Sequence, residues 1–160
     1  FYSTIAWGTA ADTPALGDYD GDGRADFAIR RASEGTFWLR TAAGSFGTVP
    51  FGLSADLVAP GDYDDDGKTD FAVVRTTGPF YVWEFEPSGT PGITVVSDTW
   101  GEPGDVVTQG DYDGDGRTDY SVWRPGSTGR FWVMTVGSRL ISIKEWGQTG
   151  DQPVARYNTF

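Results

Sequence analysis

The 160-residue chain contains no cysteine and no histidine. Without cysteine it can form neither a disulfide nor a thiolate metal site. Without histidine it lacks the commonest general base and the commonest transition-metal ligand, which excludes a Ser-His-Asp triad and a histidine-bearing zinc site. No apolar run approaches the roughly 20 residues that a membrane-spanning helix needs. We therefore expect no membrane-spanning segment.

Basic residues are also scarce, with 12 Lys and Arg against 23 Asp and Glu and a net charge of −11. This balance argues against nucleic acid as a partner, because nucleic-acid binding requires a basic surface. The acidic residues are unevenly divided between 18 Asp and 5 Glu. Loops that bind hard cations explain that bias, since Asp is short enough to point inward from a turn.

The sequence repeats itself three times. Three segments with the pattern D-Y-D-x-D-G-[RK]-x-D-[FY] begin at Asp18, Asp62 and Asp111, at spacings of 44 and 49 residues. A second marker keeps the same spacing, an aromatic-Gly pair followed by Asp five residues after the aromatic residue, at Trp7/Asp12, Phe51/Asp56, Trp100/Asp105 and Trp146/Asp151. This period is the size of a four-stranded propeller blade, but armadillo-type helical repeats have similar periods.

The residues between the markers favour strands. They are short runs of β-branched and aromatic residues bounded by Gly, Pro, Ser or Asp, and no window shows a sustained helical period. The predicted strands are Leu16, 27–30, 36–41 and 48–51; then 57–59, 71–75, 80–85 and 93–100; then 106–108, 120–124, 130–136 and 140–146.

The sequence thus predicts an all-β fold, a partial β-propeller with three four-stranded antiparallel blades in one repeat domain. The blades are residues 9–52, 53–101 and 102–147. Half-blade strands are expected at both ends, with residues 1–8 as the last strand of a preceding blade and residues 148–160 as a closing strand.

Three blades are fewer than the four to eight of a typical closed ring. The sequence leaves three interpretations open: one end of a longer propeller, a ring assembled from copies of the chain, or an open arc covered by other subunits. Uncovered flanks would expose apolar faces and strand edges. We therefore expect a protein partner or self-association at one or both flanks.

Each repeated loop is a candidate calcium site, because D-x-D-x-D-G-x-x-D provides the oxygen ligands that Ca²⁺ prefers. Aspartates at loop positions 1, 3 and 5 can converge, Gly at position 6 permits a sharp turn, the position-7 carbonyl adds a ligand and Asp at position 9 closes the shell. A polar turn without an ion would explain one copy as well, but three copies in register favour calcium. The expected ligands of the three Ca²⁺ ions are Asp18, Asp20, Asp22, the Arg24 carbonyl and Asp26; Asp62, Asp64, Asp66, the Lys68 carbonyl and Asp70; and Asp111, Asp113, Asp115, the Arg117 carbonyl and Asp119.

These loops resemble the FG-GAP/VCBS-type repeats of bacterial surface proteins and of integrin α-subunit propellers, and the Trp-Gly…Asp…Pro…Gly-Asp-Tyr-Asp run resembles the bacterial secreted form. The second loop departs from the pattern by having Asp65 in place of Gly at position 4, and the loop aspartates are absent after residue 156. The resemblance implies calcium within each blade, an adhesive or ligand-binding role, and a periplasmic, cell-surface or secreted location. Residues 151–155 resemble a closing strand, which suggests a natural C-terminus and a processed N-terminus.

Catalysis is not expected. The repeated aspartates are explained as metal ligands, and the five glutamates show no repeating pair of the glycosidase kind. We expect a non-catalytic scaffold or protein-interaction subunit of an extracytoplasmic assembly, or alternatively a carbohydrate-binding (lectin-like) or adhesion module.

The tryptophans and three recurring arginines are the remaining candidates. Most tryptophans are expected to pack between blades, namely Trp7, Trp38, Trp83, Trp100, Trp132 and Trp146, whereas Trp123 is a candidate binding residue. Arg31, Arg75 and Arg124 each follow the last loop aspartate by five residues. They are expected to pair with a carboxylate or carbonyl of the next blade, or else to recognise an acidic partner.

Overall fold

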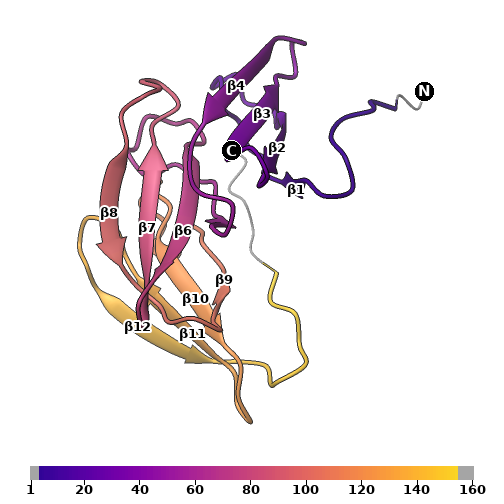
Figure 1. Cartoon of the computed structure of the whole chain (residues 1–160). Coiled ribbons are helices and arrows are strands. Elements are labelled where there is room, and N and C mark those ends of the chain that lie inside the picture. Colours follow the sequence, from indigo (N-terminus) through magenta and orange to yellow (C-terminus); the bar gives the residue numbers. More distant parts are fainter. Residues whose placement is uncertain (1–3, 155–160) are drawn as a thin grey trace.

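The computed structural model describes residues 4–154, which form three separate four-stranded antiparallel sheets (Figure 1). Each sheet consists of four consecutive strands from one repeat, so the predicted correspondence of one blade to one repeat is confirmed. The sheets follow one another in an arc and do not close a ring. Within the described part there is no helix at all, and hence none that is suited to crossing a membrane.

In each blade a first strand of two residues is followed by three longer strands of five or seven residues. The first blade contains β1 (Thr13–Pro14), β2 (Phe27–Arg31), β3 (Thr36–Arg40) and β4 (Phe46–Pro50). The second contains β5 (Leu57–Val58), β6 (Phe71–Thr77), β7 (Phe80–Glu86) and β8 (Val95–Thr99). The third contains β9 (Val106–Val107), β10 (Tyr120–Arg124), β11 (Arg130–Met134) and β12 (Ile141–Glu145).

Two expectations about strands are corrected. Leu16 lies outside β1 and is 43% exposed, because it is the neighbouring Ala15 that is buried and bonds to the Ala28 carbonyl. The half-blade strands are not seen in residues 4–8 and 148–154, which form no strand. A strand requires a hydrogen-bonded neighbour, and the described blades supply none there. The rest of both predicted end strands lies outside the described residues.

The apolar core lies between blades. One cluster joins Tyr19, Phe37 and Phe51 of the first blade to Phe71 and Val73 of the second. The other cluster joins the second and third blades through Ala59, Tyr63, Ala72, Val74, Tyr81, Trp83, Phe85, Tyr120, Val122 and Met134. Each blade therefore buries its apolar face against its neighbour, as in other repeat architectures.

A stacked aromatic pair recurs at both blade junctions. Tyr19 stacks on Phe71 with ring centroids 4.7 Å apart, and Tyr63 stacks on Tyr120 at 5.9 Å. In each pair the tyrosine is at position 2 of a loop and the other ring begins the second strand of the next blade. The same relation thus fixes both pairs of blades.

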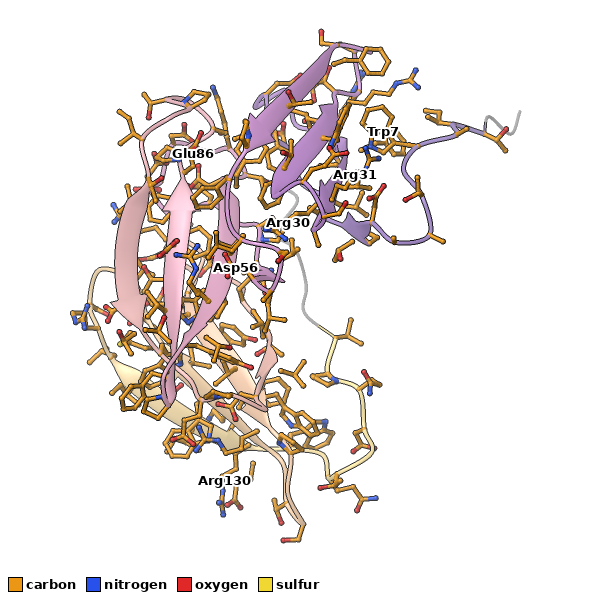
Figure 2. All side chains as sticks on the ribbon, in the orientation of Figure 1. Trp7, Arg30, Arg31, Asp56, Glu86 and Arg130 are labelled. Carbon is orange, nitrogen blue, oxygen red and sulfur yellow. The ribbon has the colours of Figure 1, made fainter. Side chains whose placement is uncertain are left out.

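One buried arginine interrupts the apolar packing at the first junction. Arg30 is 1% exposed and donates to the Leu53 carbonyl, in the segment that leads into the second blade. Its guanidinium lies over the Phe37 ring at 5.8 Å, and Asp56 lies nearby between the first two blades (Figure 2). Burial lowers the pKa of Arg30, and the charge of Asp56 opposes that shift.

Glycine is required where successive loops touch. Thr118 N donates to the Asp62 carbonyl at 2.6 Å, which brings the threonine side chain against Gly61. A Cβ at Gly61 would lie only 2.6 Å from Thr118 Cγ2. Gly17 and Thr69 make the same contact between the first and second blades.

We predict that Gly61→Ala lowers the free energy of unfolding by about 1–3 kcal/mol, because the added methyl overpacks the contact with Thr118. Urea unfolding followed by tryptophan fluorescence measures this change. Gly47→Ala is the matched control, since a Cβ at Gly47 meets open space. Equal midpoints for the two variants would contradict the tight loop contact.

Candidate metal centres

Three acidic triads lie on the loops that join the first and second strands of the three blades. In each triad one carboxylate oxygen from each of three aspartates lies within 4.8 Å of the others. The structure therefore brings together the residues predicted at positions 1, 3 and 5. The triads are Asp18, Asp20 and Asp22; Asp62, Asp64 and Asp66; and Asp111, Asp113 and Asp115.

The first aspartate organises each loop. Asp18 Oδ1 accepts a hydrogen bond from Gly21 N at 2.7 Å, and its Oδ2 accepts one from Gly23 N, also at 2.7 Å. Such side-chain bonds wind the backbone around the carboxylate. Asp62 accepts from Asp65 N and Gly67 N, and Asp111 accepts from Gly114 N and Gly116 N.

Positions 4 and 6 have left-handed backbone in every loop. The φ angles at position 4 are +77° for Gly21, +68° for Asp65 and +82° for Gly114. Asp65 thus adopts the conformation that glycine takes in the other loops, as aspartate does more readily than most residues. The second loop therefore keeps the shape of the other two despite its departure from the pattern.

The basic residue at position 7 contacts the preceding loop. Arg117 pairs with Asp65 at 3.4 Å. Lys68 lies against Gly21, where a Cβ would be 3.1 Å from Lys68 Cε. The main-chain carbonyl ligands expected at Arg24, Lys68 and Arg117 stay a prediction. The backbone N–H groups of Arg24, Lys68 and Arg117 donate to the position-5 aspartates.

The aspartate at position 9 is fully buried and braces the blade. Asp70 Oδ2 accepts from Tyr63 N at 2.9 Å, and Oδ1 accepts from Ser88 N at 3.0 Å, in the turn between β7 and β8. The position-9 aspartates of the other loops, Asp26 and Asp119, make the same two contacts, to Tyr19 and Ala42 and to Tyr112 and Val136.

Burial raises the pKa of all three position-9 aspartates, and the pKa of Asp70 rises to about 7. The backbone hydrogen bonds oppose that rise, whereas the nearby loop carboxylates add to it. Carboxylate oxygens that accept one hydrogen bond keep a second lone pair. A fourth carboxylate ligand at Asp26, Asp70 and Asp119 therefore stays a prediction.

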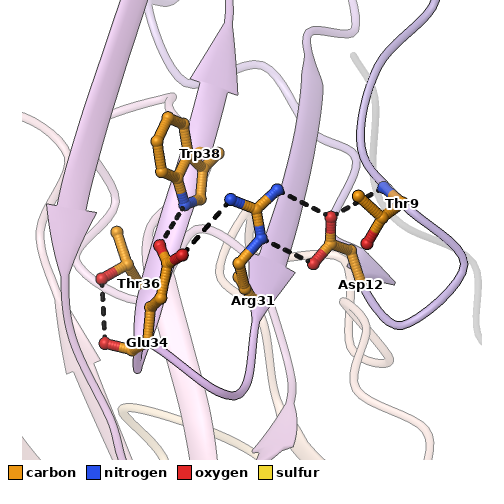
Figure 3. Close-up of polar contacts among 6 residues, drawn as sticks. All are labelled: Thr9, Asp12, Arg31, Glu34, Thr36 and Trp38. Atoms are coloured by element: carbon orange, nitrogen blue, oxygen red, sulfur yellow. Dashed lines mark hydrogen bonds and ion pairs between the residues drawn. The ribbon is translucent and has the colours of Figure 1, made fainter.

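The arginines that recur after the loops bind the marker aspartates of their own blade. Arg31 Nε and Nη2 both lie 3.0 Å from the Asp12 carboxylate, which also accepts a hydrogen bond from Thr9 N (Figure 3). The bond from Arg31 lowers the pKa of Asp12 to about 2. Arg75 pairs with Asp56, and Arg124 pairs with Asp105. The predicted carboxylate partner is therefore found, but it belongs to the same blade and not to the next.

The pairing register of the second and third strands of each blade determines which tryptophans lie against these arginines. The guanidinium carbon of Arg31 lies 4.8 Å from the ring centroid of Trp38, and that of Arg124 lies 5.3 Å from the ring centroid of Trp132. In the second blade the same strand position is occupied by Glu84, which pairs with Arg75. Trp83 is one residue away from that position, points to the other face and is 1% exposed.

Trp123 packs inside the structure and does not offer a binding surface. It is 3% exposed, and its Nε1 donates to the Trp146 carbonyl at 3.0 Å. The expectation that Trp123 is a binding candidate is therefore wrong, because the residue fills a core position equivalent to Val74. Trp146, in contrast, is 77% exposed at the outer end of the third blade.

Comparison with known proteins identifies the repeat. The family model of the FG-GAP-like repeat matches residues 18–73 and again residues 62–122. Neither the curated proteins nor the solved structures contain a match to the chain. Both family matches begin at the first aspartate of an acidic triad and run into the second strand of the following blade. The chain therefore belongs to the FG-GAP-like repeat family.

Proposed function

We propose that the chain is a calcium-rigidified, non-catalytic scaffold and protein-interaction module of an extracytoplasmic assembly. The observation that carries this proposal is the threefold recurrence of an acidic triad on an equivalent loop. The side chains of each triad offer only oxygen, which suits a hard cation such as Ca²⁺ better than zinc or copper.

The loops have enough donors for calcium. Carboxylates at positions 1, 3 and 5, a carbonyl at position 7 and a carboxylate at position 9 provide five residues, and Ca²⁺ takes six to eight oxygens with water or bidentate carboxylates completing the shell. Three divalent ions also reduce the net charge from −11 to −5. That reduction relieves the repulsion among neighbouring aspartates.

Calcium in these loops would stabilise the blade junctions as well as the loops. Asp18, the first residue of its triad, donates its backbone N–H to Thr69 Oγ1 at 3.0 Å and accepts from Thr69 N at 2.7 Å. Thr69 belongs to the second blade. An ion that fixes the conformation of Asp18 therefore also fixes the residue to which the next blade is bonded.

Exposed, carboxylate-rich loops suit compartments in which calcium is plentiful, and this supports a periplasmic, cell-surface or secreted location. The non-catalytic role is supported by the positions of the aspartates. Apart from Asp151, each is part of a loop or an arginine pair. Metal binding and structural hydrogen bonds or ion pairs thus account for the aspartates of the repeat.

Calcium removal should lower the melting temperature by roughly 15–30 °C relative to calcium at about 100-fold its dissociation constant, since each of three sites contributes about 2.7 kcal/mol there. Differential scanning calorimetry with EDTA, followed by added CaCl₂, measures the loss and its recovery. Identical melting curves with chelator and with calcium would refute the proposal.

Asp64→Asn should reduce the calcium stoichiometry from three to two, because Asn leaves the shape of the side chain but removes its charge from the second triad. Isothermal titration calorimetry counts the ions. Asp65→Asn is the matched control, since Asp65 is the next residue but lies outside the triad. A count of three ions for both variants would show that the triad does not hold the ion.

A second candidate function is carbohydrate binding. It is favoured by an apolar groove of about 360 Å³ between the second and third blades, lined by Phe80, Trp100 and Trp132 with Glu102 and Arg124 beside them. Indole faces beside charged groups suit the apolar and polar sides of a sugar ring.

If the groove binds sugar, Trp132→Ala should abolish glycan-array binding, whereas Trp38→Ala, the equivalent residue of the first blade, should retain it. Absence of any glycan signal from the wild-type chain in calcium would exclude this second candidate.

A further inference from the structure

The two outer flanks of the arc carry the two halves of the contact that joins successive blades. Inside the chain, a loop tyrosine stacks on the ring that begins the second strand of the next blade, and these four rings, of Tyr19, Phe71, Tyr63 and Tyr120, are 3–5% exposed. The equivalent tyrosine of the third blade, Tyr112, is 47% exposed. The ring that begins β2 in the first blade, Phe27, is 41% exposed.

Tyr112 is already held in the conformation of its buried equivalents. Its hydroxyl donates to the Thr108 carbonyl at 2.6 Å, as Tyr19 and Tyr63 donate to Ala15 and Ala59 at 2.7 Å. Its backbone N–H donates to Asp119, as theirs do to the corresponding aspartates. A ring fixed before association loses little conformational entropy when a partner covers it.

The loop contacts are also divided between the flanks. At both internal junctions a position-8 threonine N–H donates to the carbonyl of the first aspartate of the preceding loop, Thr69 to Asp18 and Thr118 to Asp62. At the two outer flanks, Asp111 is the first loop aspartate of the third blade, and Ala25 takes the position of the threonine in the first blade. Ala25 is exposed, keeps the donor N–H and is small enough to lie against Gly110, which corresponds to Gly61.

We infer that a second copy of this chain docks head to tail, with Tyr112 of one copy stacked on the partner's Phe27. This inference rests on the proposed function and names its partner. Because each chain contains both halves of the junction, two copies can form two identical junctions. The product is a closed ring of six blades, within the usual range of propellers.

One aromatic residue must move for the junction to form. Trp7 lies against Phe46 of the first blade, at 5.6 Å, in the place that Trp100 takes on the third blade. The partner's Trp146 is equivalent to both and requires the place of Trp7. Residues 4–8 form no strand, and the buried Trp7 Nε1 has no hydrogen-bond partner among the described residues. Residues 4–8 are therefore the segment that the partner displaces.

The mass of the full chain in excess CaCl₂, measured by sedimentation equilibrium, tests the inference. The expected mass is twice the 17.3 kDa of one chain. Phe27→Lys and Tyr112→Lys should each weaken the dimer by about tenfold or more, since each removes one ring of the stacked pair. Phe80→Lys is the control, because Phe80 is 51% exposed but lies between the second and third blades.

Mixing the two lysine variants gives a stricter test of the head-to-tail arrangement. Each variant keeps one intact half of the junction, so an equimolar mixture should form a one-to-one heterodimer at a concentration at which each variant alone is mostly monomeric. Trp7→Ala vacates the place needed by the partner's Trp146 and should leave the dimer at least as tight as in the wild type.

A monomeric wild-type chain in calcium, a dimer that survives both lysine substitutions, or loss of the dimer in Trp7→Ala would overturn the inference. Calcium binding is measured on the same samples. Three bound ions on a monomer would leave the calcium module standing and reject only the second copy as partner. Absence of bound calcium would reject the proposed function itself.

Discussion

The fold depends on the fact that no blade has a core of its own. Each sheet presents apolar side chains that are buried only by the neighbouring blade, and both apolar clusters lie at blade junctions. The stability of each blade therefore depends on its contact with the neighbouring blade, as in other repeat proteins. The acidic loops are placed at these junctions as well, because the first aspartate of one loop bonds to the threonine of the next. The conformation of each candidate metal centre and the packing between blades therefore depend on the same contact.

The buried position-9 aspartates connect the loops to the rest of each blade. Each ties the loop tyrosine to the turn between the third and fourth strands. Burial raises their pKa, which makes the charged form less favourable in the absence of a nearby cation. A divalent ion in the adjacent triad would favour the ionised carboxylate. The same ion would then stabilise the acceptor of the two backbone hydrogen bonds, one from the loop tyrosine and one from the turn.

The sequence predicted the three blades and the three triads because both leave local signatures. A tight loop around a cation requires Asp and Gly at fixed positions, and those residues recur with the blades. The faces of the strands were harder to predict, because a shift of one residue moves a side chain to the opposite face. Trp83 resembles Trp38 in sequence, but β6 and β7 are longer than β2 and β3, and an irregular register follows at Trp83 and Glu84. Partners distant in sequence, such as Arg117 and Asp65, leave no local signature, although the basic residue at position 7 was the available signal.

The outer face of the third blade differs from its counterparts in a way that bears on its exposure. Where the first two blades have alanine pairs, Ala15 with Ala28 and Ala59 with Ala72, the third has Thr108 and Ser121, which are buried and bond to each other at 3.0 Å. Polar groups satisfied within the blade need no neighbour, which is a property of terminal repeats. Tyr112 and Trp146 nevertheless stay exposed on that face. The outer face of the third blade thus combines polar side chains that are satisfied within the blade with exposed aromatic residues whose equivalents lie at the internal junctions.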